Sequence, residues 1–441
     1  MLYYSMLCFK GGKSRCFLLI ISLAVWLLIG RILLGLNSLI DLIHFASVPL
    51  AATYLFVFKP KIKKKNATSC CIYFFMLVLL AAIYFITFSM TIPDVRIHWG
   101  EVLIAIYFLT SIYAIFWMFD KFMKGVINFL FAGIKNKTAL AFTKITINLA
   151  ILIFAAAPYL VSFFITHWIK FADTDNPKTL EGTKYSRVSF CSNDGTELKG
   201  WFVSSDNMVS ESTVIIVPGR SAAKNLFLSY AKILSGNNYN VLIFDMRGNG
   251  GSNGHKYSFG VNEINDVIGA ADYIRKSRPG YSNYIFGYGI NEGASALIAA
   301  ASVDERFTAI VSDNACGYDI TMPGWLAGRM PGWLEKSLLS MTKTFVHIDI
   351  GQPIPGTEGL YEKISQISPS PILVANSLRN NKSSRHKTIE LFSKAKEPKQ
   401  LWLAPSEENE YADSQYFLNI LETFDKGKIK QQTGRWRISK Q

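Results

Sequence analysis

The chain has 441 residues, half of them hydrophobic, and a formal net charge of +14. The charge is uneven, because the first 169 residues hold 15 of the 46 Lys and Arg residues but only 4 of the 32 Asp and Glu residues. These cations lie between long apolar runs, which is typical of a membrane protein and argues against nucleic-acid binding. We therefore expect the lipid bilayer, and no nucleic acid, among the partners.

Five apolar runs fill the first part of the chain, at 17–36, 39–58, 71–92, 102–119 and 145–164. Each is close to the roughly 20 residues that a helix needs to cross a bilayer. The sequence therefore predicts an all-α, multi-pass transmembrane region of about five helices over residues 1–169. A count of four stays open, with 17–58 as one kinked span and a re-entrant piece.

The distribution of Lys and Arg predicts the orientation of these spans. Basic residues gather before the first run and at 59–65 and 121–144, whereas the intervening loops carry almost no excess positive charge. By the positive-inside rule the N-terminus is cytoplasmic, and five spans make the C-terminal domain extracytoplasmic. Four spans would return that domain to the cytoplasm. The segment 121–144 is interpreted as an amphipathic helix on the cytoplasmic interface.

A polar linker at 170–183 leads to a second domain at 184–425, in which strand and helix patterns alternate. A hairpin is expected at 188–202, around the turn Asp194–Gly195. Further strands are expected at 213–218, 240–245, 284–288, 308–312, 371–375 and 400–404, with helices at 226–234, 262–275, 292–301 and 414–424. This order predicts an α/β domain with a doubly wound, mostly parallel sheet. A small cap is expected at about 315–360, and a basic tail at 426–441.

One segment of this domain has the pattern of a nucleophile elbow. Residues 283–295 read as a strand, a sharp turn and a helix, and Gly289-Ile-Asn291-Glu-Gly293 fits G-x-S-x-G except at its centre. Upstream, residues 245–252 read Asp-Met-Arg-Gly-Asn-Gly-Gly-Ser. With these motifs, residues 185–424 resemble the α/β-hydrolase family, specifically its membrane-anchored serine-hydrolase branch. The resemblance implies that fold, with a cleft under the cap.

The resemblance also places the functional positions of the family, and asparagines occupy three of them. The nucleophile falls at Asn291, the acid at Asn380 and the histidine at Asn409, while the oxyanion-hole N–H groups fall at Arg220 and Glu292. A carboxamide has no proton that a base could remove to make an oxygen nucleophile. No histidine follows His386, so the usual loop supplies no general base. We therefore expect an inactive domain, without cofactor or metal.

The expected role of such a domain is binding or scaffolding, through a protein partner or a small apolar ligand in the cleft. An alternative is a membrane-bound serine esterase, lipase or peptidase with a relocated site, for which His255 and His347 are the candidate histidines. Ser295 lies one turn beyond Asn291 and is expected to point into packing. A third hypothesis makes the spanning region the functional part, in transport or assembly.

Two further features leave alternatives open. The expected cap repeats Pro-Gly-Trp at 323–325 and 331–333, which suits a cover over the cleft, contact with the bilayer interface, or ordinary core packing. Cys191 and Cys316 are the only cysteines of the second domain, either as a disulfide or as two thiols. The basic tail is either solvated or in contact with anionic headgroups.

Overall fold

The structure is a computed structural model of the chain. It describes residues 136–167 and 184–438, apart from 207–209, 221, 223, 255, 316, 319, 323–326, 378–381 and 406–409, together with Ala24, Ala46, Met123, Gly125 and Val126. By their contacts the residues form two units, and Phe164–Thr321 with Pro353–Gln441 make up the second. The segment Met322–Gln352 belongs to the first unit, with the helices before Phe163.

One continuous helix of the first unit has the properties of a membrane span. It consists of α6 (Lys137–Ile151), a π-helical turn η2 (Leu152–Ala156) and α7 (Ala157–Thr166). The side chain of Asn136 caps its start, because Oδ1 accepts the N–H of Thr138 at 2.9 Å. Within it, Thr138–Phe163 is long and apolar enough to cross a bilayer, by length and composition alone.

This helix begins earlier than expected, since α6 already contains residues 137–144 that we assigned to an interfacial helix. Apart from Ala24 and Ala46, the first four apolar runs lie outside the described residues. The described part of the chain therefore holds one candidate span, and the count of five stays a prediction.

The second unit is built on one sheet of eight strands, in the order β1-β2-β4-β3-β5-β6-β7-β8. The first two strands form the predicted antiparallel hairpin, and β2 is antiparallel to β4, whereas all later pairs are parallel. The prediction of a mostly parallel α/β sheet is thus confirmed. The strands are β1 (Tyr185–Cys191), β2 (Glu197–Val203), β3 (Ser212–Val217), β4 (Asn240–Phe244), β5 (Tyr284–Ile290), β6 (Phe307–Asp313), β7 (Ile372–Asn376) and β8 (Lys399–Leu403).

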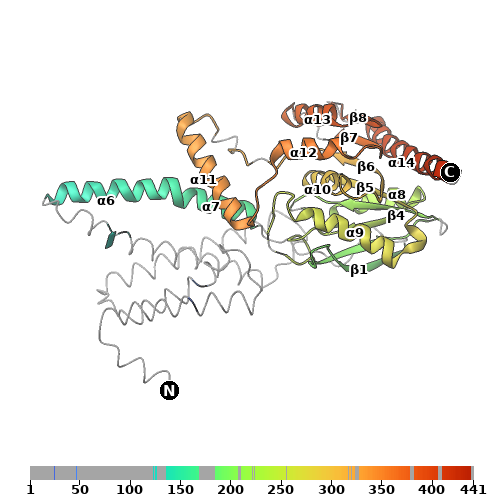
Figure 1. The fold of residues 1–441 in the computed structure, drawn as a ribbon, viewed down its shortest axis with the longest axis horizontal. Helices are drawn as coiled ribbons and strands as arrows, with labels where there is room; N and C mark the ends of the chain where they lie inside the picture. The colour runs from blue at the N-terminus through green and yellow to red at the C-terminus, as the bar shows by residue number, and fades with distance from the viewer. Residues whose placement is uncertain are drawn as a thin grey trace, which may run out of the picture. The chain divides into compact units, whose positions relative to one another are not determined.

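Helices cover both faces of this sheet, as Figure 1 shows. On one face α9 (Glu263–Ser277) contacts β1 and β3, and α10 (Glu292–Ala301) contacts β5 and β6. Next to them lie α12 (Gly356–Ser365) and α13 (Lys382–Lys394), with short 3-10 turns η4 (Lys224–Phe227) and η5 (Pro279–Tyr281) elsewhere in the domain. On the other face lie α8 (Leu228–Gly236) and α14 (Glu410–Ile438).

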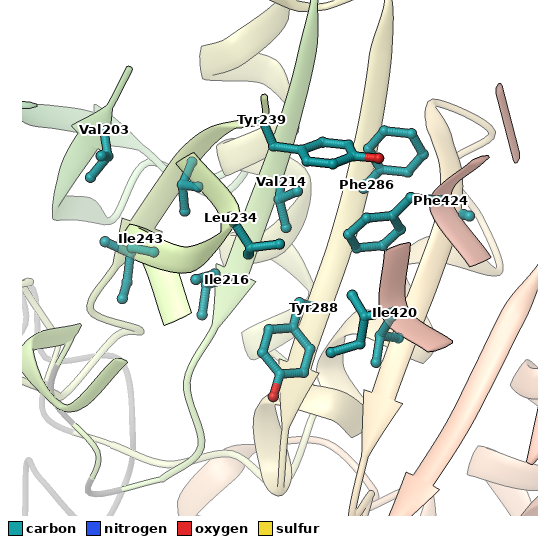
Figure 2. Packing of buried hydrophobic residues seen from close by; sticks show 14 of the residues in the cluster. Val203, Val214, Ile216, Leu234, Tyr239, Ile243, Phe286, Tyr288, Ile420 and Phe424 are labelled. Carbon is teal, nitrogen blue, oxygen red and sulfur yellow. The ribbon is translucent and has the colours of Figure 1, made fainter. Parts of the chain in front are cut away.

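Alternation along the strands explains how the two faces are filled. In β3, Val214 and Ile216 pack into the core cluster under α8 and α14, together with Tyr239, Phe286 and Phe424, as Figure 2 shows. The residues between them in β3 point to the opposite face, because side chains alternate along a strand. All six β3 residues are buried, as expected of a central parallel strand covered on both sides.

The C-terminal segment differs from the expected tail. Helix α14 continues beyond Phe424 to Ile438, so most of residues 426–441 is helical. Gly427 lets this helix approach β6 closely, since a Cβ there would lie 2.9 Å from the carbonyl oxygen of Thr308. Further along, Gln432 donates to the hydroxyl of Tyr284. A close backbone approach and a side-chain hydrogen bond thus continue the contacts of α14 with the sheet into a segment whose sequence reads as polar.

The segment expected as a cap contains α11 (Gly332–Ile350) and the start of α12. Only α12 belongs to the sheet unit, where it packs against α10 and α13. Helix α11 belongs to the first unit. A cap over the cleft therefore stays a prediction.

Candidate functional site

The elbow at Asn291 has the backbone that its motif predicts. Strand β5 ends at Ile290, Asn291 adopts φ 53° and ψ −122°, and α10 starts at Glu292. Positive φ is unfavourable for most residues, and Asn tolerates it better than others. Gly293 is required sterically, because a Cβ there would lie 2.2 Å from the carbonyl oxygen of Val217. The strand-turn-helix geometry is intact although its central side chain is an amide.

A chain of amides fixes the Asn291 side chain. Its Oδ1 accepts a hydrogen bond of 2.6 Å from Nδ2 of Asn314, the residue after β6. The Oδ1 of Asn314 in turn accepts from Nδ2 of Asn376, at the end of β7, at 3.1 Å. Ser384 and Thr388 of α13 complete the cluster around Asn376. The oxygen of Asn291 is therefore already engaged within the domain.

Sequence reasoning missed Asn314 and Asn376, although one signal could have found them. Both lie at the carboxyl ends of parallel strands, Asn314 just after β6 and Asn376 as the last residue of β7, and sites of open α/β sheets form at this edge. Asn380 and Asn409, expected in place of the acid and the histidine, lie outside the described residues. Their assignment stays a prediction, and Asn291 is the one of the three whose surroundings the structure describes.

The expected oxyanion hole contains a carboxylate. The backbone N–H of Arg220 donates to Oε2 of Glu292 at 3.2 Å. Gly219 makes room for this contact, because a Cβ there would lie 3.0 Å from the same oxygen. An oxyanion hole stabilises negative charge that develops during acyl transfer by pointing N–H groups at it. Here one of the two expected donors already holds a negatively charged side chain.

The guanidinium group of Arg220 lies beside this carboxylate and is largely buried. Its carbon atom Cζ is 4.7 Å from the centre of the Tyr257 ring, a cation–π distance. Burial lowers the pKa of Arg220, and the nearby Tyr257, Glu292 and Glu263 oppose that shift. A large cation therefore shares the site with the carboxylate.

Little space remains around these groups. The pocket is lined by residues of the elbow, of the loop after β4 and of the segment 256–263, including Arg220, Arg247, Lys256, Tyr257, Glu263, Glu292 and Tyr318. The space open to the centre of a water molecule is ≈ 20 Å³. This is room for about one water, well short of the ~300 Å³ or more of a typical ligand pocket.

A buried carboxyl group lies behind the elbow. Asp313, the last residue of β6, accepts from the N–H of Ser377 at 3.0 Å and from the hydroxyl of Tyr416 at 2.9 Å. Burial raises the pKa of Asp313, and these hydrogen bonds counteract the shift only in part. The hydroxyls of Tyr416 and Tyr288 are 3.2 Å apart. No histidine is among the partners of Asp313 in the described part of the chain, so this carboxyl orients no base there.

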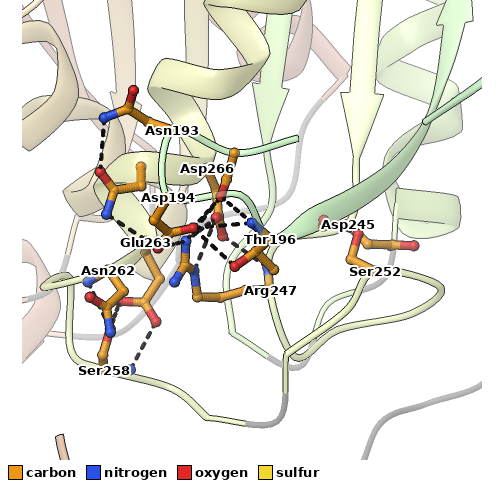
Figure 3. A network of polar contacts seen from close by, with 12 residues as sticks. Asn193, Asp194, Thr196, Asp245, Arg247, Ser252, Ser258, Asn262, Glu263 and Asp266 are labelled. Carbon is orange, nitrogen blue, oxygen red and sulfur yellow. Dashed lines mark hydrogen bonds and ion pairs between the residues drawn. The ribbon is translucent and has the colours of Figure 1, made fainter. Parts of the chain in front are cut away.

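The loop after β4, the second motif of the resemblance, is held by paired buried charges. The Nζ of Lys224 lies 2.7 Å from Asp245, and both side chains are almost fully buried, at 3% and 0% exposure. Arg247 forms ion pairs with Asp266 at 2.6 Å and with Asp194 at 2.8 Å, as Figure 3 shows. Desolvation raises the pKa of Asp266 to about 6 despite its bond to Arg247. These pairs connect the loop to η4, to α9 and to the turn of the β1–β2 hairpin.

Two of the alternative catalytic residues, Ser295 and His347, are among the residues that the structure describes. Ser295 is fully buried in α10, as expected of a residue that points into packing. His347 is exposed on α11 and belongs to the other unit, and His255 lies outside the described residues. Cys191 is a free, exposed thiol on β1, and Cys316 lies outside the described residues. The described residues contain no group of three His, Cys, Asp or Glu side chains that could hold a metal ion.

Comparison with known proteins gives relatives without an assigned activity. No family model matches the chain. The chain is 25% identical over 236 residues to the uncharacterized protein YfhR of Escherichia coli O157:H7. The aligned residues make up 50% of this chain and 72% of that relative. The protein of the same name in Salmonella typhi is 24% identical over 245 residues, or 53% of this chain and 77% of the relative.

Solved structures resemble somewhat more than half of the chain. An esterase from Pyrococcus furiosus is 20% identical, covers 59% of this chain and 98% of its own, and has a TM-score of 0.45. A hypothetical protein from Pseudomonas aeruginosa is 19% identical, covers 58% of this chain and 97% of its own, and has a TM-score of 0.46. The α/β-hydrolase GrgF from a Penicillium species is 18% identical, covers 55% of this chain and 99% of its own, and has a TM-score of 0.40. Two of these three neighbours are thus named as an esterase and an α/β-hydrolase.

Proposed function

We propose that the chain is a membrane-embedded, α/β-hydrolase-like protein that has lost catalysis and acts by binding or scaffolding. The observation that carries the proposal is the state of the elbow. The nucleophile position holds Asn291, whose oxygen accepts from Asn314, and the N–H of Arg220 donates to Glu292. Both places at which an acyl substrate would react are thus engaged by groups of the domain itself.

The nature of the bound molecule follows from the remaining space. A pocket with room for about one water does not suit a small apolar ligand inside the domain. A protein partner needs no such cavity, since protein interfaces form on exposed surface. We therefore favour a protein partner over a ligand in the cleft.

The proposed membrane setting rests on the sequence and on one described helix. The candidate span Thr138–Phe163 agrees with the last of the five apolar runs. We propose a multi-pass protein of the cell or inner membrane, with a cytoplasmic N-terminus and an extracytoplasmic sheet domain. A reporter fused to the C-terminus tests the side. If the reporter shows that the C-terminus lies in the cytoplasm, four spans would be favoured over five.

Active-site labelling tests the loss of catalysis. The full-length protein in detergent is treated with a fluorophosphonate probe beside an active serine hydrolase. We expect no labelling of the natural chain and none of Asn291→Ser, because a serine there would still lack a histidine base. Covalent labelling of a serine in the natural chain, lost when that serine is changed to alanine, would overturn the proposal.

A serine hydrolase with an atypical site is the second candidate function. Its support is the retained elbow backbone, together with structural neighbours that are named esterases. The same experiment separates the two functions, since only the hydrolase predicts a labelled serine. Labelling of Asn291→Ser alone would mean that the domain still supplies a base, and it would favour this second candidate.

A further inference from the structure

Helix α11 packs against the candidate membrane span, although its sequence is inserted between two strands of the sheet. It contacts the π-helical turn η2, and the rings of Phe345 and Tyr159 meet edge to face at 5.7 Å. Figure 1 shows α11 beside α7. Thr342, Val346 and Asp349 are buried. This segment therefore belongs structurally to the membrane-associated unit.

A second side of α11 exposes large apolar side chains. Trp333 is 65% exposed, Met341 41% and Ile348 39%. At 3.6 residues per turn these three positions fall within about 80° of one another. The candidate span has a similar exposed face, formed by Phe142, Ile145, Leu149 and Leu152. Exposed apolar faces of this kind are unfavourable in water and favourable in lipid.

A third side of α11 is basic. Lys336 and Lys343 are exposed and one heptad apart, so they lie within about 20° of each other around the helix. This side adjoins the apolar one at Trp333. A helix with lysines on its polar face and Trp on its apolar face is typical of a membrane interface, where lysines meet anionic headgroups.

We propose that α11 binds the surface of an anionic phospholipid bilayer, alongside the span. Its packed side holds the span through Phe345 and Tyr159, its apolar side enters the acyl region, and its lysines face lipid phosphates. Tyr159 lies in the last helical segment of the span, on the way to the sheet domain. The contact is therefore with the leaflet from which the chain leads to that domain. This inference rests on the proposed membrane embedding of the protein.

Depth-dependent fluorescence quenching tests the proposal on the full-length protein. The natural chain and Trp333→Phe are reconstituted in vesicles of phosphatidylcholine and phosphatidylglycerol whose acyl chains are brominated near the headgroup or near the bilayer centre. The difference between the two proteins gives the signal of Trp333. We expect this signal to be quenched most by bromine near the headgroup. It should be protected from aqueous acrylamide.

Matched variants separate lipid contact from other causes. Trp402→Phe is the control, because Trp402 stacks on Tyr416 inside the sheet domain and its difference signal should show no lipid quenching. Changing both Lys336 and Lys343 to Gln should reduce the quenching of Trp333 in anionic vesicles but leave it unchanged in pure phosphatidylcholine. Equal quenching of natural and lysine-substituted proteins in anionic vesicles would contradict the headgroup contact.

Alkaline carbonate extraction distinguishes this inference from the underlying membrane assignment. If the full-length protein leaves the membrane on extraction, the membrane embedding itself is wrong. If it stays but Trp333 is quenched by acrylamide and not by brominated lipid, only the role of α11 is wrong. Trp333 shielded from both quenchers would show that it contacts protein, which also overturns the proposal.

Discussion

The loop after β4 and the elbow after β5 lie side by side at the pocket, yet they differ in what each retains. In the loop, the buried charges of Asp245 and Arg247 have opposite charges as partners, Lys224 of η4 and Asp266 of α9. At the elbow, the backbone course is retained, while the side chain of Asn291 accepts from Asn314 and that of Glu292 accepts from the N–H of Arg220. Ion pairs between buried charges thus hold the loop, whereas steric fit and contacts of amide and carboxylate groups hold the elbow.

The largest effect is expected on the loop side of this comparison. Lys224→Met would leave Asp245 buried without its counter-charge, and breaking a buried pair costs about 3–5 kcal/mol. The free energy of unfolding, from urea titration in detergent, measures the loss. Lys276→Met is the control, since that exposed lysine pairs with Asp272 on the surface and should cost at most about 1 kcal/mol. Equal losses of unfolding free energy in the two variants would show that the buried ion pair of Lys224 contributes no more than the surface pair of Lys276.

The next effect concerns the backbone of the elbow. Gly293→Ala would bring a Cβ to within 2.2 Å of the Val217 carbonyl oxygen, so strand and helix would have to separate. Overpacking of this kind costs about 1–3 kcal/mol. Gly280→Ala is the matched control, because nothing lies within 4 Å of an added Cβ there. An unchanged unfolding midpoint for Gly293→Ala would show that the elbow is loosely packed.

A smaller effect is expected for the Asn291 side chain. Asn291→Ala removes the acceptor of the Asn314 amide, for a loss of about 1 kcal/mol in unfolding free energy, and adds strain at φ 53°. Asn291→Gly removes the same acceptor but tolerates that φ. The glycine variant should therefore be the more stable of the two. The reverse order, by thermal unfolding, would mean that positive φ is not retained.

The smallest expected effect is a loss of folding stability at low pH caused by protonation of Asp194, which pairs with Arg247. Although desolvation opposes it, hydrogen bonds from Ser192 and the charge of Arg247 lower the pKa of Asp194 from 3.8 to about 2. The charged form is thus favoured in the folded state. Its contribution is present above pH 3.8 and is lost as the pH falls towards 2.

Asp194→Asn removes this titration. Unfolding midpoints measured from about pH 5 to about pH 2 should fall less steeply for the variant than for the natural chain. Parallel curves would show that Arg247 is neutralised by Asp266 alone. Only the buried ion pairs Lys224–Asp245 and Arg247–Asp266 would then hold the loop.

Local sequence patterns determined much of the sheet domain. Continuous apolar runs marked β3 and β4, the Asp194–Gly195 turn marked the hairpin, and spaced glycines marked the elbow. Each signal depends on residues close in sequence, because strand burial, turn geometry and close approach are local requirements. The prediction that Asn291 supplies no nucleophile also comes from the sequence, since it depends on the identity of one side chain.

Only the tertiary structure decided which distant groups meet. The amide of Asn314 reaches Asn291, and that of Asn376 reaches Asn314, because the parallel strands β5, β6 and β7 end at one edge. Glu292 meets the N–H of Arg220 across the same edge. The place of α11 against the span, and the packing of α14 as far as Gln432, likewise depend on partners far away in the chain. Sequence periodicity shows which side of a helix or strand is apolar, but only the fold determines which element packs against that side.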